Sequence, residues 1–164
     1  MICISDPLLL VPRGGVAGAS AFAQPRNSDH LWSPETIFDD KKTQGWYSGL
    51  TMFPIYLWYD FRGEVSPAKI TCFPRRDVKY EDQMPTRMEF IASNEEVCKQ
   101  SSRWVVLCTM ICTDHETCVN DGISCNVSSE KLGRLSYRCL GVRILETKRG
   151  NIATLKRIKM SGWK

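Results

Sequence analysis

The sequence predicts an all-β sandwich. Several short segments alternate apolar and polar residues with a period of two, which is the pattern of a half-buried strand. Turn-forming residues separate these segments, and no long amphipathic helical pattern is found. The chain of 164 residues fits one domain. A domain of this size buries roughly 70% of its unfolded surface, so a core can form without a structural metal.

The amino-terminal part is expected to contribute little regular structure. The run Leu10-Val11-Pro12-Arg13-Gly14 resembles a thrombin cleavage sequence, so residues 1–15 are interpreted as an expression remnant or a leader. Their apolar stretch is too short for a signal-peptide core or a membrane span. The domain is then expected to occupy residues 16–164. Extended chain and loops are predicted over residues 14–34, and one short helical turn over residues 33–40.

The clearest strand signals lie between residues 55 and 77. Residues 55–61 alternate with a period of two and are rich in aromatic and β-branched side chains. Arg62-Gly63-Glu64 and Ser66-Pro67 interrupt the pattern before residues 69–73 resume it, which predicts two strands joined by a turn. Pro74-Arg75-Arg76-Asp77 follows, and it places three charges at a strand exit, where binding residues are often found.

Further strands are predicted downstream, at residues 88–93, 104–110, 135–145 and 152–160. The segment 113–132 is polar, long and rich in cysteine, so we expect it to form a loop excursion rather than core.

The cysteines favour an oxidising compartment. Eight are present, and six of them lie between Cys98 and Cys139, so disulfides there would cross-link local loops; their pairing stays open. Asn126-Val127-Ser128 is an N-glycosylation acceptor and agrees with a secreted glycoprotein. Cys112-x-x-His115-x-x-Cys118 offers ligands that zinc would accept, but disulfides explain the whole set of cysteines and are favoured.

Composition and motifs argue against several function classes. The net charge of +4 is mild and the basic residues do not gather on one face, so no nucleic acid partner is expected. No segment is long and apolar enough for a transmembrane helix. With two histidines, no Gly-x-Ser-x-Gly elbow and no phosphate-binding loop, nothing nominates a catalytic mechanism, and we expect no enzyme activity.

The order of the motifs resembles the discoidin or coagulation-factor type C superfamily, and most closely its galactose-binding-like carbohydrate-binding modules. The resemblance is carried by Tyr59-Asp60-Phe61, by Pro74-Arg75-Arg76-Asp77 and by the strands at 88–93 and 138–145, in that order. It implies a jelly-roll sandwich of about eight main strands with a ligand among the loops at one end. The cysteine-rich segment would be an insertion. Such folds bind sugars, phospholipids or proteins.

The resemblance also implies a structural calcium site, which this chain fits poorly. Asp39 matches the aspartate ligand, but Asp40 and Gln44 replace the expected glycine and threonine. Lys156 or Arg157 stands where a glutamate is expected. Because calcium takes six to eight oxygen ligands, a cation in that shell opposes it. We therefore expect no cofactor, with calcium as a disfavoured alternative, and a basic residue of the last strand paired with Asp39.

The loops contain the groups that carbohydrate recognition requires, namely aromatic rings that stack on a pyranose and charged planar groups that bind vicinal hydroxyls. The candidate ligand residues are Arg75, Arg76, Asp77, His30, Trp32 and Tyr47. Trp46 matches a core position of the family and is interpreted as packing. Asp82 stands where the second basic residue of the related fucose-lectin pattern belongs.

The function expected from the sequence is therefore an extracellular, non-catalytic module that binds glycans or glycoproteins on cell or microbial surfaces. Two alternatives stay open. One is an adhesion or assembly domain that binds a protein partner. The other is a phospholipid-binding module with Leu50, Met52 and Phe53 as apolar loop residues that enter the membrane.

Overall fold

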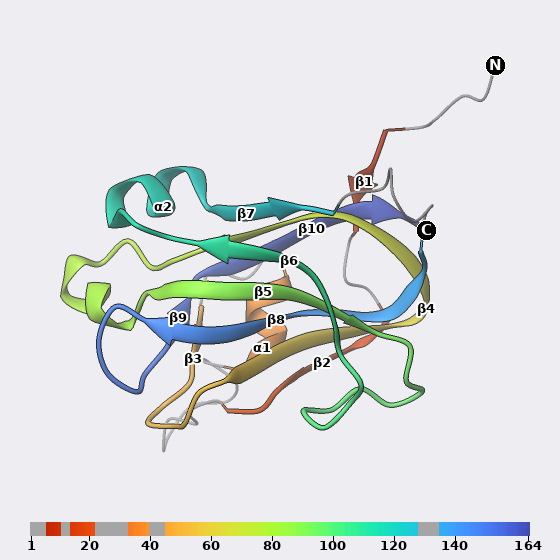
Figure 1. The fold of residues 1–164 in the computed structure, drawn as a ribbon, viewed down its shortest axis with the longest axis horizontal. Coiled ribbons are helices and arrows are strands. Elements are labelled where there is room, and N and C mark those ends of the chain that lie inside the picture. The colour runs from red at the N-terminus through yellow and green to blue at the C-terminus, as the bar shows by residue number, and fades with distance from the viewer. Residues whose placement is uncertain (1–5, 11–13, 22–32, 40–44, 128–134) are drawn as a thin grey trace.

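The computed structural model describes residues 6–10, 14–21, 33–39, 45–127 and 135–164 (Figure 1). The elements in these ranges are β1 (Leu8–Leu9), β2 (Val16–Ala19), α1 (Pro34–Phe38), β3 (Trp46–Tyr47), β4 (Ile55–Phe73), the 3-10 helix η1 (Val78–Gln83), β5 (Pro85–Ser93), β6 (Val105–Ile111), α2 (His115–Asp121), β7 (Ile123–Asn126), β8 (Tyr137–Thr147), β9 (Thr154–Leu155) and β10 (Arg157–Trp163). None of the helices in these ranges has the length and apolar character needed to cross a membrane.

The strands form two antiparallel layers that share β4. The first half of β4 pairs with β2 and β8, and β5 and β6 extend that layer beyond β8. The second half of β4 pairs with β7 and β10, and β1 pairs with β10. Figure 1 shows β4 bending from one layer to the other at one end of the molecule. A separate two-stranded sheet joins β3 to β9. The predicted all-β sandwich is confirmed.

The predicted turn within residues 55–73 is wrong, because β4 continues through it as one bent strand. Arg62 has a φ of 55°. The Asp60 carboxylate accepts a hydrogen bond from the Arg62 amide at 2.8 Å and another from Arg138 Nε at 3.0 Å. A side chain that satisfies a backbone donor in this way stabilises a local bend. The pairing of β4 with β8 shifts register between Asp60 and Val65, so the bend is accommodated within the strand.

The core lies between the two layers. Along β4, Ile55 and Leu57 are fully buried while the alternate Tyr56 and Trp58 are partly exposed, as the period of two requires. Trp46 has no exposed surface, and its Nε1 donates to the Ala21 carbonyl at 3.0 Å, so its predicted packing role is confirmed. A buried indole needs such an acceptor for its N–H.

Most of the remaining strand predictions are confirmed, since the segments predicted at 88–93, 104–110 and 135–145 are β5, β6 and β8. The short helical turn is α1, which begins with a proline at its first turn. The last predicted strand is divided instead into β9 and β10. Lys156 lies between them, and its amide donates to the Phe73 carbonyl of β4 at 2.7 Å.

The amino-terminal segment takes part in the fold although residues 1–15 were set apart from the domain. Leu8 and Leu9 pair with Gly162 and Ser161 of β10, and Leu10 is only 2% exposed. The origin of this segment as a leader or an expression remnant stays a prediction.

The cysteine-rich segment is structured rather than a loop excursion, so that prediction is wrong for residues 113–127. Asp114 caps α2 by accepting from the Thr117 amide at 2.9 Å, and Gly122 ends the helix with a φ of 78°. Strand β7 follows and pairs with β4. The rest of the segment, up to residue 132, lies outside the described residues.

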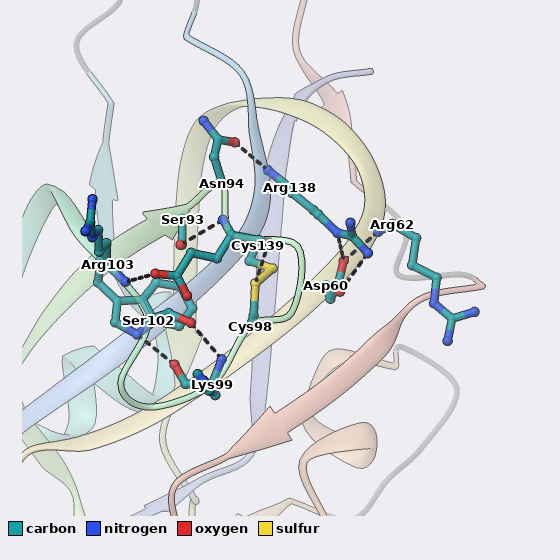
Figure 2. The surroundings of a disulfide bond; sticks show 12 residues. Asp60, Arg62, Ser93, Asn94, Cys98, Lys99, Ser102, Arg103, Arg138 and Cys139 are labelled. Atoms are coloured by element: carbon teal, nitrogen blue, oxygen red, sulfur yellow. Dashed lines mark hydrogen bonds and ion pairs between the residues drawn. A yellow bond between two sulfur atoms is a disulfide. The ribbon is translucent and has the colours of Figure 1, made fainter.

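Six cysteines form three disulfides, Cys98–Cys139, Cys108–Cys125 and Cys112–Cys118. The preference for disulfides over zinc is therefore confirmed, because a sulfur in a disulfide offers no thiolate to a metal. Figure 2 shows the first of these bonds, which ties the loop after β5 to β8 beside the ion pair of Asp60 with Arg138. Cys72 is a buried free thiol whose pKa is raised by burial.

Candidate functional site

Four segments from three separate parts of the sequence meet at one end of the sandwich. They are residues 74–77 after β4, the helix η1, the first turn of α2, and residues 148–151 between β8 and β9. The amide of Lys148 donates to the Met84 carbonyl at 3.0 Å and so joins the last segment to η1. Figure 1 shows α2 and these turns at the end opposite to the bend of β4. We call this surface the loop end.

Arg75 is the central cation of the loop end. Its Nη2 lies 2.9 Å from Asp77 Oδ2, and its guanidinium carbon lies 4.1 Å from the centre of the Tyr80 ring. An ion pair and a cation–π contact together hold the planar guanidinium in one orientation. The side chain of Arg75 is 21% exposed, so part of its donor surface faces solvent. The neighbouring Arg76 is exposed.

Charged side chains of η1 pair with the turn between β8 and β9. Glu81 binds Lys148, and this hydrogen bond lowers the pKa of the Glu81 carboxyl below its usual value. Asp82 lies 3.8 Å from Arg149. Asp82, which stands where the fucose-lectin pattern has a basic residue, therefore lies beside a cation, Arg149, from a segment much later in the chain.

The disulfide-bonded helix α2 brings a histidine to the same surface. His115 Nε2 lies 3.3 Å from the Arg75 carbonyl oxygen, and the ring is half-buried. Asp114, next to it, has a lowered pKa because it accepts hydrogen bonds from the Thr117 hydroxyl at 2.6 Å and from the Thr117 amide at 2.9 Å. The loop end thus combines carboxylates, cations, an imidazole and an aromatic ring within one surface.

The sequence-predicted ligand residues are only partly brought together. Arg75 and Asp77 are in contact, and Arg76 lies between them in the chain. Tyr47 is half-buried on β3, whose strand partner is β9. His30 and Trp32 lie outside the described residues. That these residues bind a ligand stays a prediction.

The predicted metal ligand Asp39 ends α1 as its C-cap. Of the implied calcium ligands, Asp40 and Gln44 lie outside the described residues, while β10 contributes Arg157, preceded by Lys156. Either cationic side chain in place of the implied glutamate would oppose a calcium ion, and binding without calcium stays a prediction. The pairing of Asp39 with a basic residue of the last strand stays a prediction.

A second cluster with possible metal ligands consists of Asp60, Cys98 and Cys139 (Figure 2). Both sulfurs belong to one disulfide, and the carboxylate is bound by Arg138 at 3.0 Å. These groups are therefore engaged in protein contacts and offer no metal site.

The sequence analysis missed several members of the loop end, among them Tyr80, Glu81, Lys148, Arg149 and, as a site residue, His115. Only His115 carried a signal, since it stands midway between Cys112 and Cys118. That spacing could suit zinc ligands, but in the structure Cys112 and Cys118 close a small disulfide ring instead.

No protein-family model matches the chain, and no curated protein sequence is significantly similar to it. Solved structures are similar in fold. The family 32 carbohydrate-binding module of Clostridium perfringens NanJ, solved with galactose, superposes with a TM-score of 0.68 at 11% identity and covers 95% of this chain and 99% of its own. A further family 32 module from Clostridium perfringens, solved with GalNAc-β-1,3-galactose, gives a TM-score of 0.70 at 13% identity, covering 93% and 99%.

The carboxy-terminal domain of a chitobiase from Bacteroides fragilis gives a TM-score of 0.69 at 14% identity and covers 94% of this chain and 97% of its own. The chain therefore has the galactose-binding-like fold of family 32 carbohydrate-binding modules. The resemblance drawn from the sequence motifs is confirmed at the level of the fold.

Proposed function

We propose that this chain is an extracellular, non-catalytic carbohydrate-binding module whose ligand site is the loop end. The observation that supports this most strongly is its fold, which it shares over nearly its whole length with modules solved in complex with galactose and with GalNAc-β-1,3-galactose. Because one fold hosts many functions, the proposal also needs a site with suitable chemistry.

The loop end has that chemistry. Sugar hydroxyls are bound best by planar or charged groups whose orientation is fixed in advance. Arg75 is held by Asp77 and Tyr80, and Glu81 is held by Lys148. Donors and acceptors of both charges are present, which suits a neutral ligand that donates and accepts hydrogen bonds.

An extracellular location agrees with the three disulfides, since cytosolic thiols are kept reduced. Binding without calcium is part of the proposal, because the resemblance implies a glutamate ligand where this chain has Lys156 or Arg157.

A glycan array followed by isothermal titration with galactose and with GalNAc-β-1,3-galactose tests the proposal. We expect saturable binding to at least one glycan, unchanged by a calcium chelator. Arg75→Ala and Arg76→Ala should each weaken it at least tenfold, since a hydrogen bond from a charged group contributes about 1.5–3 kcal/mol. Lys69→Ala, on the exposed face of β4, is the matched control and should bind as the unmodified chain does.

The melting temperature separates lost binding from lost structure. The partly exposed pair of Arg75 with Asp77 is expected to contribute about 0–1 kcal/mol, so Arg75→Ala should lower the melting temperature by no more than about 4 °C. A chain that binds no glycan on the array would contradict the proposed function. Unchanged binding in both arginine variants would place the site elsewhere.

Phospholipid binding is the second candidate, and it is favoured by Leu50 and Met52, which are 83% and 86% exposed. Phe53 instead packs partly against the core. Exposed apolar side chains near basic residues can enter the interface of an anionic membrane. Sedimentation with phosphatidylserine vesicles tests this candidate. Binding that is lost in the Leu50→Ser, Met52→Ser double variant, without any glycan signal, would replace the carbohydrate proposal.

A further inference from the structure

The first turn of α2 is held rigidly against the exit of β4. The Cys112–Cys118 disulfide joins the end of β6 to the helix across a sequence separation of 6. Within that ring, the Asp114 carboxylate accepts from both the amide and the hydroxyl of Thr117. A covalent cross-link and a helix cap therefore fix the same short segment, and His115 lies between them.

The contact of His115 with the Arg75 carbonyl oxygen shows which ring nitrogen of the imidazole carries the hydrogen. A carbonyl oxygen can only accept a hydrogen bond, so His115 Nε2, 3.3 Å from the Arg75 oxygen, carries the hydrogen. In a neutral ring Nδ1 is then an acceptor. Among the described residues Nδ1 has no hydrogen-bond partner, and the ring is half-buried rather than enclosed.

Groups of both charges surround this ring. Glu81 and Asp114 are both close enough to His115 and Lys148 to interact with them electrostatically. The backbone carbonyl oxygen that the imidazole contacts belongs to Arg75, whose side chain pairs with Asp77. The available acceptor on His115 therefore lies among the same charged groups that form the loop end.

We propose that His115 is a ligand-contacting residue of the carbohydrate site, that its Nδ1 accepts a hydrogen bond from a sugar hydroxyl, and that the Cys112–Cys118 disulfide holds it in place. The inference rests on the proposed function and names a residue for it that lies outside the family motif. The expected ligand is a pyranose in which a free hydroxyl, bound by His115, lies next to the group of the same sugar that Arg75 binds.

Two substitutions separate contact with the ligand from support of Arg75. His115→Ala removes both ring nitrogens. His115→Gln places an amide near the position of Nε2, so it can still donate to the Arg75 carbonyl but lacks an acceptor at the position of Nδ1. We expect both variants to raise the Kd for the best glycan from the array about tenfold, which corresponds to about 1.4 kcal/mol. His115→Gln should keep the melting temperature of the unmodified chain.

Asn120→Ala is the matched control, because Asn120 is exposed on the same helix but lies beyond its first turn. It should bind as the unmodified chain does. The Cys112→Ala, Cys118→Ala double variant keeps the imidazole and removes the cross-link, and it should also raise the Kd several-fold.

Nuclear magnetic resonance of chain labelled with ¹⁵N-histidine tests the contact directly. The chain has only two histidines, so a His30→Gln variant assigns the ring signals of His115. In the free protein we expect the tautomer with the proton on Nε2. Titration with the glycan should shift the Nδ1 resonance of His115 along the same saturation curve as binding.

A Kd within twofold of the unmodified value in both His115 variants, while Arg75→Ala abolishes binding, would overturn this inference and leave the proposed function intact. Wild-type affinity in His115→Gln, with weaker binding in His115→Ala, would mean that His115 only positions Arg75. That result would also overturn the inference that His115 contacts the ligand. Absence of glycan binding by the unmodified chain would instead refute the proposed function, and this inference with it.

Discussion

The three disulfides close loops of very different length. We therefore predict that the disulfide whose removal costs the most stability is not the one whose removal costs the most ligand affinity. The comparison uses two double variants, Cys112→Ala with Cys118→Ala and Cys98→Ala with Cys139→Ala. The first pair spans a sequence separation of 6 and the second a separation of 41. All four cysteines are buried, with exposures between 0% and 9%, so the substitutions remove comparable packing.

The magnitude follows from the loop that each bond closes in the unfolded chain. By the chain-entropy relation, a loop of 6 residues corresponds to about 2.2 kcal/mol of stabilisation and a loop of 41 residues to about 3.9 kcal/mol. Removal of Cys98–Cys139 should therefore lower the free energy of unfolding by about 1.7 kcal/mol more than removal of Cys112–Cys118. Binding should respond in the opposite way, because only Cys112–Cys118 holds a segment of the loop end.

Urea denaturation followed by tryptophan fluorescence measures the free energy of unfolding, and glycan titration of the same two proteins measures the affinity. The Cys108–Cys125 pair, with a separation of 17, should fall between the others at about 3.1 kcal/mol. A larger stability loss for Cys112–Cys118 than for Cys98–Cys139 would refute the loop-length reasoning. Equal affinity in the two double variants would refute the claim that only the Cys112–Cys118 disulfide supports the loop end.

Two further predictions concern local packing and acid sensitivity. Gly18→Ala should lower the free energy of unfolding, measured by urea denaturation, by about 1–3 kcal/mol, because its new Cβ would lie 2.3 Å from the Trp58 ring. Gly63→Ala is the control, since a Cβ there meets nothing within 4 Å. Equal losses of stability in the two variants would contradict the packing account. Glu95 has a lowered pKa because it accepts a hydrogen bond from the Arg103 amide, so the stability it contributes is present above its unfolded pKa and is lost as pH falls. Glu95→Gln should therefore lessen the fall in melting temperature between about pH 5 and pH 3, and an unchanged acid profile would show that this hydrogen bond contributes nothing.

The layers of the fold could be predicted from sequence because each strand carries its own signal. The alternation along residues 55–61 and 88–93 is local, and β4 and β5 follow it. The bend of β4 could not be predicted, since a turn and a bend begin with the same residues, Arg62 and Gly63. The difference is made by the Asp60 carboxylate, which Arg138 holds from another strand. Such a contact is visible only after the chain has folded.

Helix α2 was missed for a different reason. Its local signals were present, since Asp114 is a favourable N-cap and Gly122 adopts the positive φ that ends a helix. A helix of 7 residues is too short to show an amphipathic period, and the density of cysteines drew the interpretation toward a loop. Short helices held by a disulfide need little intrinsic propensity, so sequence pattern underestimates them.

The loop end could be predicted only where one motif carried it. Pro74-Arg75-Arg76-Asp77 lies in a continuous stretch, and its arginine and aspartate are in contact. Two other members come from much later in the chain: His115 lies 40 residues after Arg75, and Lys148 lies 67 residues after Glu81. The sandwich topology alone brings each of them to its partner. In both contacts, His115 with Arg75 and Lys148 with Glu81, the two partners come from different segments. The sequence around either partner alone therefore does not reveal the contact. A site assembled in this way is conferred by the fold, and the charged exit of β4 is the part of it that sequence motifs can reveal.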